Sequence, residues 1–404
     1  MQQHSDEVDG SKTPLRRVPF FTPIMLAVLL AMVAEAMAGS YMALLAVQRV
    51  GMSPLELSAF LTVPAATGLV VTTIFGHLQD RNPVVWPLLL SLFSKAVGLT
   101  LCAYLTDTWL LVLNAGVLFG LSAASFALLF AVAKAHLDQI GGSTVLRGMA
   151  ALRLIASLSW TIGPALGAIL IALKGFAGVY FGAALLAAAS LVIVSLARIK
   201  VVSSEDQERE KLSIQLLLRA TPAVFALSAF HTAMFMGSNA MSIVVAEDIG
   251  SQSDVGVLFS LCAGLEVIFM GVFIAWPDLS TKSWLLFMGF ALFAAYFVMA
   301  IAWPTMWSLY LGQVPRAAGI GIISIVGMEM VQRMLLGRAG TASALFGNTI
   351  SVGFLLSGLG TGVWANSFGY WSLFVLCAAL CVFGTLALLC SPGVIRTHGD
   401  LPTA

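Results

Sequence analysis

Long apolar runs, bounded by charged or turn residues, follow one another from residue 20 to residue 390. Each run reaches the ~20 residues that a helix needs to cross a bilayer core. None alternates polar and apolar positions as a strand of an outer-membrane barrel does. The pattern predicts an all-α membrane protein. Twelve transmembrane helices are expected, near 20–48, 56–76, 84–105, 108–136, 147–173, 176–197, 220–246, 254–276, 282–302, 305–332, 339–364 and 368–390.

The composition agrees with this pattern and excludes several classes of protein. Of 404 residues, 59% are hydrophobic and only 10% are charged, and the mean hydropathy is +0.97. Soluble domains carry about 25% charged residues, so a soluble enzyme, a nucleic-acid-binding protein and a disordered chain are excluded. The net charge of +1 indicates no polyanionic partner. The five cysteines, an odd number, all lie in apolar runs and predict no disulfide framework.

Lysine and arginine are unevenly divided between the two predicted sides of the membrane. Fifteen lie on the side that carries both termini, and two, Arg49 and Lys174, lie on the other. Positive loops face the cytoplasm, so both termini are expected there. The predicted organisation is a cytoplasmic N-terminal tail (1–19), an N-terminal six-helix bundle (20–197), a cytoplasmic linker (198–219), a C-terminal six-helix bundle (220–390) and a cytoplasmic C-terminal tail (391–404).

The N-terminal segment has a competing interpretation. Arg16-Arg17, the apolar stretch from Phe20 and the small residues Ala36-Met37-Ala38 imitate a cleavable signal peptide. However, the apolar stretch continues to Val47, which is long enough to span, and its removal would leave eleven spans. We therefore expect it to remain as the first span.

The two halves of the chain resemble each other weakly. The second span and the eighth align without a gap at an offset of 198 residues, which matches Glu56 with Asp254 and Asp80 with Asp278. The fifth and eleventh spans begin alike, at Arg147 and Arg338. Many secondary transporters consist of repeated halves, with the substrate site between them near the bilayer midplane.

Two short motifs lie where they could control access to such a site. The loop after the second span reads Gly76-His77-Leu78-Gln79-Asp80-Arg81; Gly76 would allow close helix approach, and Asp80 could cap a helix or pair with a cation. The fifth span carries Gly163-Pro164-Ala165-Leu166-Gly167, whose small residues allow backbone packing and whose proline bends the helix. A common interfacial turn and a kinked packing helix are the competing interpretations.

These motifs, together with longer stretches, carry a resemblance to a known family. The 76–81 loop resembles the first half of the signature loop of the major facilitator superfamily, although Asn82-Pro83 replaces the residues that usually follow. The 163–167 segment resembles the Gly-Pro motif of the exporter branch. Stretches 128–134, 149–167, 263–266 and 337–353 resemble the sugar efflux transporter family.

The resemblance implies the major facilitator fold, with two pseudo-symmetric six-helix bundles. It also implies proton-coupled export of sugars, glycosides or related sugar-like molecules across the bacterial inner membrane. It leaves the substrate open.

Charged residues within the predicted spans are the candidates for coupling. A charge at the bilayer centre costs roughly 2.5–3.5 kcal/mol, so it usually faces a cavity or the bundle interior. Glu266, midway in the eighth span, and Glu35, in the first, are the proton-coupling candidates, with a static ion pair as the alternative for Glu266. Glu35, Arg316 and Glu329 depart from the family pattern. The complete set is Glu35, Lys95, Arg153, Glu266, Arg316 and Glu329.

Polar side chains in the spans are the candidates for substrate binding. Arg153, Ser157 and Trp160 follow one another at helical spacing, so one face of the fifth span could line a cavity. An arginine fork suits hydroxyl or carboxylate groups, and a tryptophan can stack on a sugar ring, although tryptophan more often serves in packing. The remaining candidates are His231, Asn239, Gln313, Asn348 and Ser351. For His231 a satisfied core position is the competing interpretation.

No phosphate loop, zinc-ligand spacing or nucleophile with a base is present in the sequence, so no enzyme activity, cofactor or metal is expected. We predict a monomeric secondary active transporter that works by alternating access as a proton antiporter. Its expected partners are a small-molecule substrate, protons and the lipid bilayer, with no nucleic acid. A multidrug or metabolite/proton antiporter of the same superfamily is the alternative, and a non-transporting membrane enzyme or sensor is a third hypothesis.

Overall fold

The computed structural model describes residue 15, residue 18 and residues 20–81, 84–198, 214–335 and 338–391. The described part contains helices and no strands, which confirms the all-α prediction. Most of the predicted linker and almost all of both predicted tails lie outside the described residues.

The helices follow the predicted spans closely, and the second is extended to Arg81. In chain order the elements are α1 (Phe21–Gly39), α2 (Met42–Leu44), η3 (Leu45–Val50), α3 (Pro54–Arg81), α4 (Trp86–Tyr104), α5 (Thr108–Asn114), η4 (Ala115–Phe119), α6 (Gly120–Ser122), α7 (Ala124–Asp138), α8 (Gly142–Leu196), α9 (Ile214–Val244), η5 (Val245–Ile249), α10 (Gln252–Ala275), η6 (Pro277–Thr281), α11 (Trp284–Ala302), α12 (Met306–Ile322), η7 (Ile323–Gly327), α13 (Met328–Met334), α14 (Ala339–Phe368) and α15 (Ser372–Leu389).

Eleven helical segments of the described chain are long and apolar enough to cross a membrane, and one of them supplies two spans. Helix α8 contains 55 residues, which would extend ~80 Å at ~1.5 Å per residue, far more than a bilayer core of ~30 Å. Gly175 breaks it, with φ 63° and ψ −161°, a conformation open to glycine. The two parts of α8 are therefore the predicted fifth and sixth spans, and the total is twelve.

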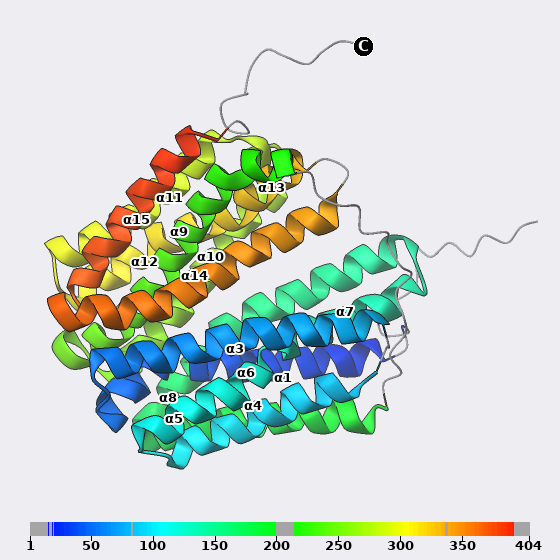
Figure 1. Ribbon diagram of the computed structural model, residues 1–404, viewed down its shortest axis with the longest axis horizontal. Helices are drawn as coiled ribbons and strands as arrows, with labels where there is room; N and C mark the ends of the chain where they lie inside the picture. Colours follow the sequence, from blue (N-terminus) through cyan, green and yellow to red (C-terminus); the bar gives the residue numbers. More distant parts are fainter. Residues whose placement is uncertain are drawn as a thin grey trace, which may run out of the picture.

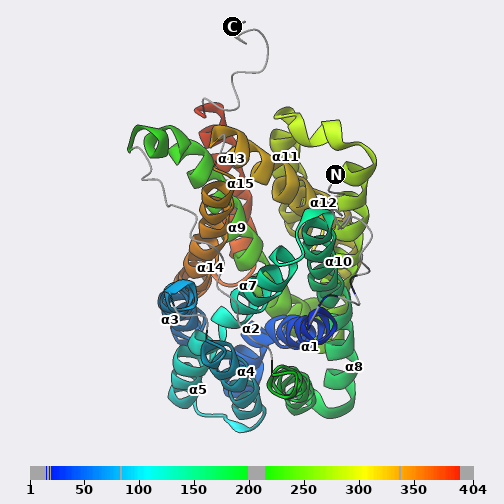
Figure 2. The ribbon, with the colours of Figure 1, turned by 90° about the vertical axis from the view of Figure 1, so that its right-hand side faces the viewer.

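The spans form two bundles that follow the two halves of the chain (Figure 1). Helices α1 to α8 make one bundle and α9 to α15 the other, and the bundles pack through two helix pairs, α8 with α10 and α3 with α14. Figure 2 shows the second pair side by side at the border between the bundles. In Figure 1 the axes of α3 and α14 lie close together at one end and diverge toward the other.

Local structure repeats between the halves at the offset that the sequence indicates. Ser53 and Glu56 form a capping box at the start of α3: the Ser53 backbone N–H donates to Glu56 Oε2 at 2.8 Å, and the Glu56 N–H donates to Ser53 Oγ at 3.4 Å. At the start of α10, 198 residues later, Ser251 and Asp254 make the same box, with distances of 2.9 and 3.4 Å. This pairing of Glu56 with Asp254 supports the predicted repeat.

A π-helical turn occurs in the first span of each group of three. The four turns are η3, η4, η5 and η7, which lie in the first, fourth, seventh and tenth spans. Such turns are rare and usually mark functional positions within helices.

Candidate functional site

The bundles are joined by hydrogen bonds at the end of the molecule that carries the turns at 51–53 and 250–251. The Gln252 amide donates to Gln48 Oε1 at 2.7 Å, and the Gln48 amide donates to the Ala246 carbonyl at 3.3 Å. Ser242 donates to the Ser40 carbonyl at 3.3 Å. These bonds link η3 and its neighbours to their counterparts in the second half, so this end of the molecule is closed.

Glycines bring the two helix pairs into backbone contact at the same end. A Cβ at Gly256 of α10 would overlap the Tyr41 hydroxyl and the Pro164 carbonyl. A Cβ at Gly362 of α14 would overlap the Pro54 carbonyl and Ser58. Each pair therefore closes on a glycine that has no room for a larger side chain.

Some hydroxyl groups in these two contacts form hydrogen bonds, and others have no partner among the described residues. Ser58 of α3 donates to the Leu359 carbonyl of α14 at 3.1 Å. One turn further along α3, Thr62 Oγ1 is buried and has no hydrogen-bond partner among the described residues. In the other contact, Ser260 Oγ of α10 and Thr161 Oγ1 of α8 are likewise buried without a partner there. Thr62 and Ser260 are 198 residues apart, so the repeat reproduces this feature.

Several predicted site residues are exposed in the middle of their spans. Arg153 on α8 and Asn348 and Ser351 on α14 are exposed, and Trp160 is 37% exposed. Ser157 on α8 is half-buried. Because a charge in mid-span avoids lipid, the exposed face of α8 that carries Arg153 is best explained as facing a polar interior.

Glu266 lies on α10 beside this part of α8. A Cβ at Gly264 would lie 3.7 Å from Thr161 Cγ2, so the two helices are in contact two residues before Glu266. This contact places Glu266 near the level of Ser157 and Trp160. Glu266 is half-buried, and no hydrogen bond or ion pair within 4.0 Å joins it to the residues whose side chains the structure describes.

Glu35 has a partner that its sequence neighbours do not indicate. Lys95 of α4 donates to Glu35 Oε2 of α1 at 2.6 Å. The lysine side chain is 6% exposed and the glutamate side chain 51% exposed. The Lys95 ammonium is therefore buried behind the Glu35 carboxylate, whose other side is accessible.

Arg316 is buried, at 3% exposure, inside the C-terminal bundle. Its guanidinium donates to Gln313 Oε1 at 3.0 Å and to Ser238 Oγ at 2.7 Å. The rings of Phe259 and Tyr296 lie 5.5 and 5.4 Å from it, within the range of cation–π attraction. No carboxylate of the described residues lies within 4.0 Å, so polar and aromatic groups hold this charge.

Three other substrate-binding candidates are occupied by protein contacts. His231 is buried, with Nδ1 3.2 Å from Thr349 Oγ1. Gln313 is fully buried; its amide donates to the Leu309 carbonyl at 2.9 Å, and its carbonyl accepts from Arg316. The half-buried Asn239 amide donates to Thr361 Oγ1 at 3.3 Å. In this conformation His231 and Gln313 belong to the packed bundle, whereas Arg153, Asn348 and Ser351 are open.

The two sequence motifs have different surroundings. A Cβ at Gly76 would meet no described atom within 4 Å, so the close helix approach expected there is not present. Arg81, the last residue of α3, is exposed, and the side chain of Asp80 lies outside the described part.

The Gly163–Gly167 segment does pack backbone to backbone. A Cβ at Gly163 would lie 2.9 Å from the Val33 carbonyl and 2.9 Å from the Met37 nitrogen of α1, and one at Gly167 would overlap the Tyr41 ring. Pro164 lies between them, and its carbonyl borders Gly256 of the other bundle. The motif thus packs α8 on α1 and brings α8 against α10.

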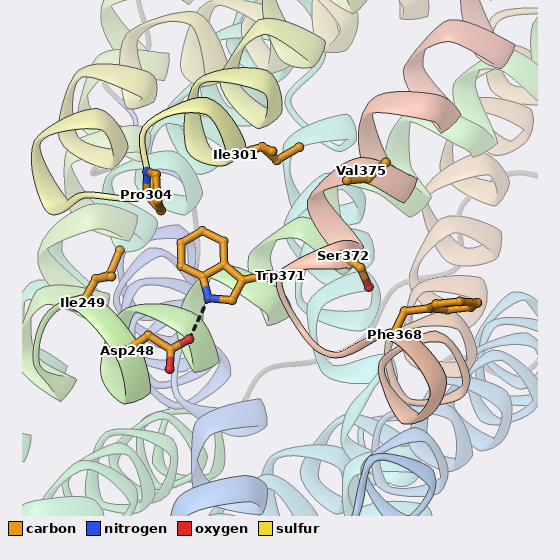
Figure 3. Close-up of a pocket in the computed structure, with 8 residues that line it drawn as sticks. All are labelled: Asp248, Ile249, Ile301, Pro304, Phe368, Trp371, Ser372 and Val375. Atoms are coloured by element: carbon orange, nitrogen blue, oxygen red, sulfur yellow. Dashed lines mark hydrogen bonds between the residues drawn. The ribbon is translucent and has the colours of Figure 1, made fainter.

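A separate hollow of about 680 Å³ lies on the closed end of the C-terminal bundle (Figure 3). The Trp371 indole donates to Asp248 Oδ2 at 2.7 Å in it. Pro304, Phe368 and Val375 form part of its wall. None of the residues that line it is a predicted site residue, and its one carboxylate is already bonded to the tryptophan.

Two bundles of six spans that meet at glycines, together with charged residues in mid-span, have the architecture of a membrane transporter. The sequence profile of the Major Facilitator Superfamily matches residues 24–276, and the chain belongs to this superfamily. Among solved structures, a peptide transporter in complex with alafosfalin has a TM-score of 0.78 at 13% identity and covers 96% of this chain and 98% of its own. At that identity the likeness shows the fold.

Relatives of higher identity define the branch of the superfamily. A Deinococcus radiodurans protein named as a sugar efflux transporter is 33% identical over 371 residues, which cover 90% of this chain and 95% of the relative. Sugar efflux transporter A of Escherichia coli is 26% identical over 373 residues, with 90% and 93% covered. The protein is a member of the sugar efflux transporter family, a multi-pass membrane transporter rather than an enzyme.

Proposed function

We propose that the protein exports sugars, glycosides or related sugar-like molecules by alternating access, in exchange for protons, as a monomer in the bacterial inner membrane. Both termini lie in the cytoplasm in this proposal, in agreement with the distribution of lysine and arginine. The closed end that carries the 51–53 and 250–251 turns then faces the periplasm. The substrate would enter between the bundles from the cytoplasmic side.

The observation that carries the proposal is the position of Glu266. It is a mid-span carboxylate without a direct protein partner among the described side chains, on the helix that contacts α8 next to Ser157 and Trp160. A carboxylate at the border of the two bundles can hold a proton in one arrangement and release it when the bundles move. Arg153, Asn348 and Ser351 supply exposed groups for sugar hydroxyls, and Trp160 supplies a ring for the apolar sugar face.

Transport by reconstituted protein tests the proposal. A panel of labelled mono- and disaccharides and glycosides is first screened by thermal shift, because a ligand of the folded state raises its stability. With the best binder, Glu266→Gln should abolish transport driven by a pH gradient and retain counterflow exchange of the sugar, since the glutamine stays permanently neutral.

Glu329→Gln is the matched control. Glu329 already pairs with Arg333, at 3.1 Å, near the end of its span, and its variant should keep gradient-driven transport. Undiminished gradient-driven transport by Glu266→Gln would refute the assignment of Glu266. A wild-type protein that neither binds nor moves any sugar of the panel would refute the substrate class.

A further inference from the structure

The Glu35–Lys95 ion pair connects a buried cation to an exposed anion in mid-span. The residues lie on α1 and α4, 60 positions apart, and the N–O distance of 2.6 Å is that of a charge-assisted hydrogen bond. Glu35 is halfway along the apolar run from Phe21 to Val50. Its half-exposed carboxylate therefore faces the polar interior between the bundles rather than lipid.

The pair determines the charge and the hydrogen-bonding groups that a substrate would meet in this part of the interior. Oε2 of Glu35 is bonded to the lysine, and the exposed side of the carboxylate can still accept a hydrogen bond from a hydroxyl group. A cationic substrate would meet the ammonium of Lys95 directly behind the same carboxylate. The ion pair as a whole has no net charge, and its Glu35 carboxylate can still accept a hydrogen bond.

The other mid-span charges also disfavour a cationic substrate over a neutral one. Besides this neutral pair, Arg153 and Arg316 are positive and Glu266 is negative. The described interior therefore carries no excess of negative charge, even when Glu266 is ionised. Glu329 lies near the end of its span and pairs with Arg333, so Glu35 is the only acidic residue besides Glu266 midway along a span of the described chain. A lipophilic cation would be attracted to Glu35 only if no other cation already neutralised it.

We propose that Lys95 determines specificity: by neutralising Glu35 it reserves the site for neutral hydroxylated molecules and excludes lipophilic cations. This proposal rests on the proposed function and narrows its substrate class. Lys95 acts through Glu35, since the lysine is almost fully buried. Removing it would convert an acceptor of hydroxyl groups into a site for a cation.

Binding of tritiated tetraphenylphosphonium to the purified full-length chain tests this. Wild type should bind the probe weakly, and Lys95→Met should bind it at least tenfold more tightly. The double variant Glu35→Gln with Lys95→Met should return to the wild-type level, and Lys95→Arg should remain there. Lys134→Met is the control for charge alone, because it breaks an exposed pair of the same 2.6 Å length, with Asp138, and should not change binding.

The exchange of the two residues, Glu35→Lys with Lys95→Glu, keeps an ion pair and guards against a misfolded Lys95→Met. It should bind the probe no better than wild type, since the carboxylate would then be buried. The proposal is overturned if folded Lys95→Met gains no affinity, if the gain persists without Glu35, or if the exchanged pair binds the cation tightly. Because binding is measured without a gradient, these results are independent of proton coupling at Glu266.

Discussion

Two hydroxyl groups on α3, one turn apart, should respond in opposite ways to removal. Ser58 donates across the contact between the bundles to the Leu359 carbonyl, whereas Thr62 Oγ1 is buried at the same contact without a partner. A Cβ at Gly358 would lie 3.0 Å from that oxygen, which shows how closely α14 covers it. Thr62→Val replaces the hydroxyl with a methyl group of similar shape, and Ser58→Ala removes a hydrogen bond.

The magnitudes follow from the state of each hydroxyl. A buried polar group without a partner costs about 1–3 kcal/mol, and a satisfied hydrogen bond contributes about 0.5–1.5 kcal/mol net. We therefore expect Thr62→Val to stabilise the closed contact by about 1 kcal/mol and Ser58→Ala to destabilise it by about 1 kcal/mol. For a bundle of this size each change corresponds to a Tm shift of about 2–4 °C.

Thermal unfolding of the purified variants in one detergent measures both shifts. Thr62→Ser keeps the unpaired hydroxyl and serves as the control, since it should bring no rise in Tm. Ser260→Ala should raise the Tm as Thr62→Val does, because Ser260 occupies the repeated position. In reconstituted protein, Thr62→Val should also slow turnover up to about fivefold, since 1 kcal/mol in favour of one conformation changes its equilibrium by that factor. A fall in Tm for both Thr62→Val and Ser58→Ala would refute the reasoning.

Further changes test other parts of the fold and site. Gly163→Ala should lower the Tm by several degrees, because its Cβ would lie 2.9 Å from backbone atoms of α1; Gly76→Ala, in open space, should be neutral, and equal losses in thermal unfolding would contradict this. Ser53→Ala and Ser251→Ala should each cost about 1 kcal/mol through loss of an N-cap, and similar Tm losses would support the repeat, while unequal ones would not. Trp160→Leu should weaken sugar binding about tenfold in a binding titration, the equivalent of ~1.4 kcal/mol; unchanged affinity would exclude stacking.

The fold could be predicted because the signal is long and continuous. Apolar runs with charged ends determine the number of spans, and the one ambiguity, the 55-residue α8, is resolved by the same Gly175 that separates the fifth and sixth predicted spans. The repeat could be found at Glu56 and Asp254 because each capping box depends on two residues only three positions apart. Interactions between residues so close in the chain can be predicted from the sequence.

The partners of the mid-span charges could not be predicted. The spans are apolar on most sides, so the pattern does not show which face of a helix points inward. Glu35 and Lys95 are 60 positions apart, and Arg316 and Ser238 are 78 apart; both contacts depend on how helices rotate about their axes. Gln313 is a predicted substrate-binding residue because of its hydrogen-bonding capacity, and in the structure its carbonyl accepts from Arg316, three residues away.

The π-helical turn η7 has a consequence for how the chain tolerates changes of length. Such a turn holds one residue more than the α-helical turn it replaces. Deleting a residue from 323–327 would therefore turn η7 into a regular α-helical turn and leave the residues beyond it in register. Arg333, which donates to the Thr281 carbonyl at 2.9 Å, would keep its partner, and Arg316 before the turn would stay in place. A single-residue deletion within η7 should therefore do less harm than one in the regular helix of α12, which would rotate everything beyond it by about 100°.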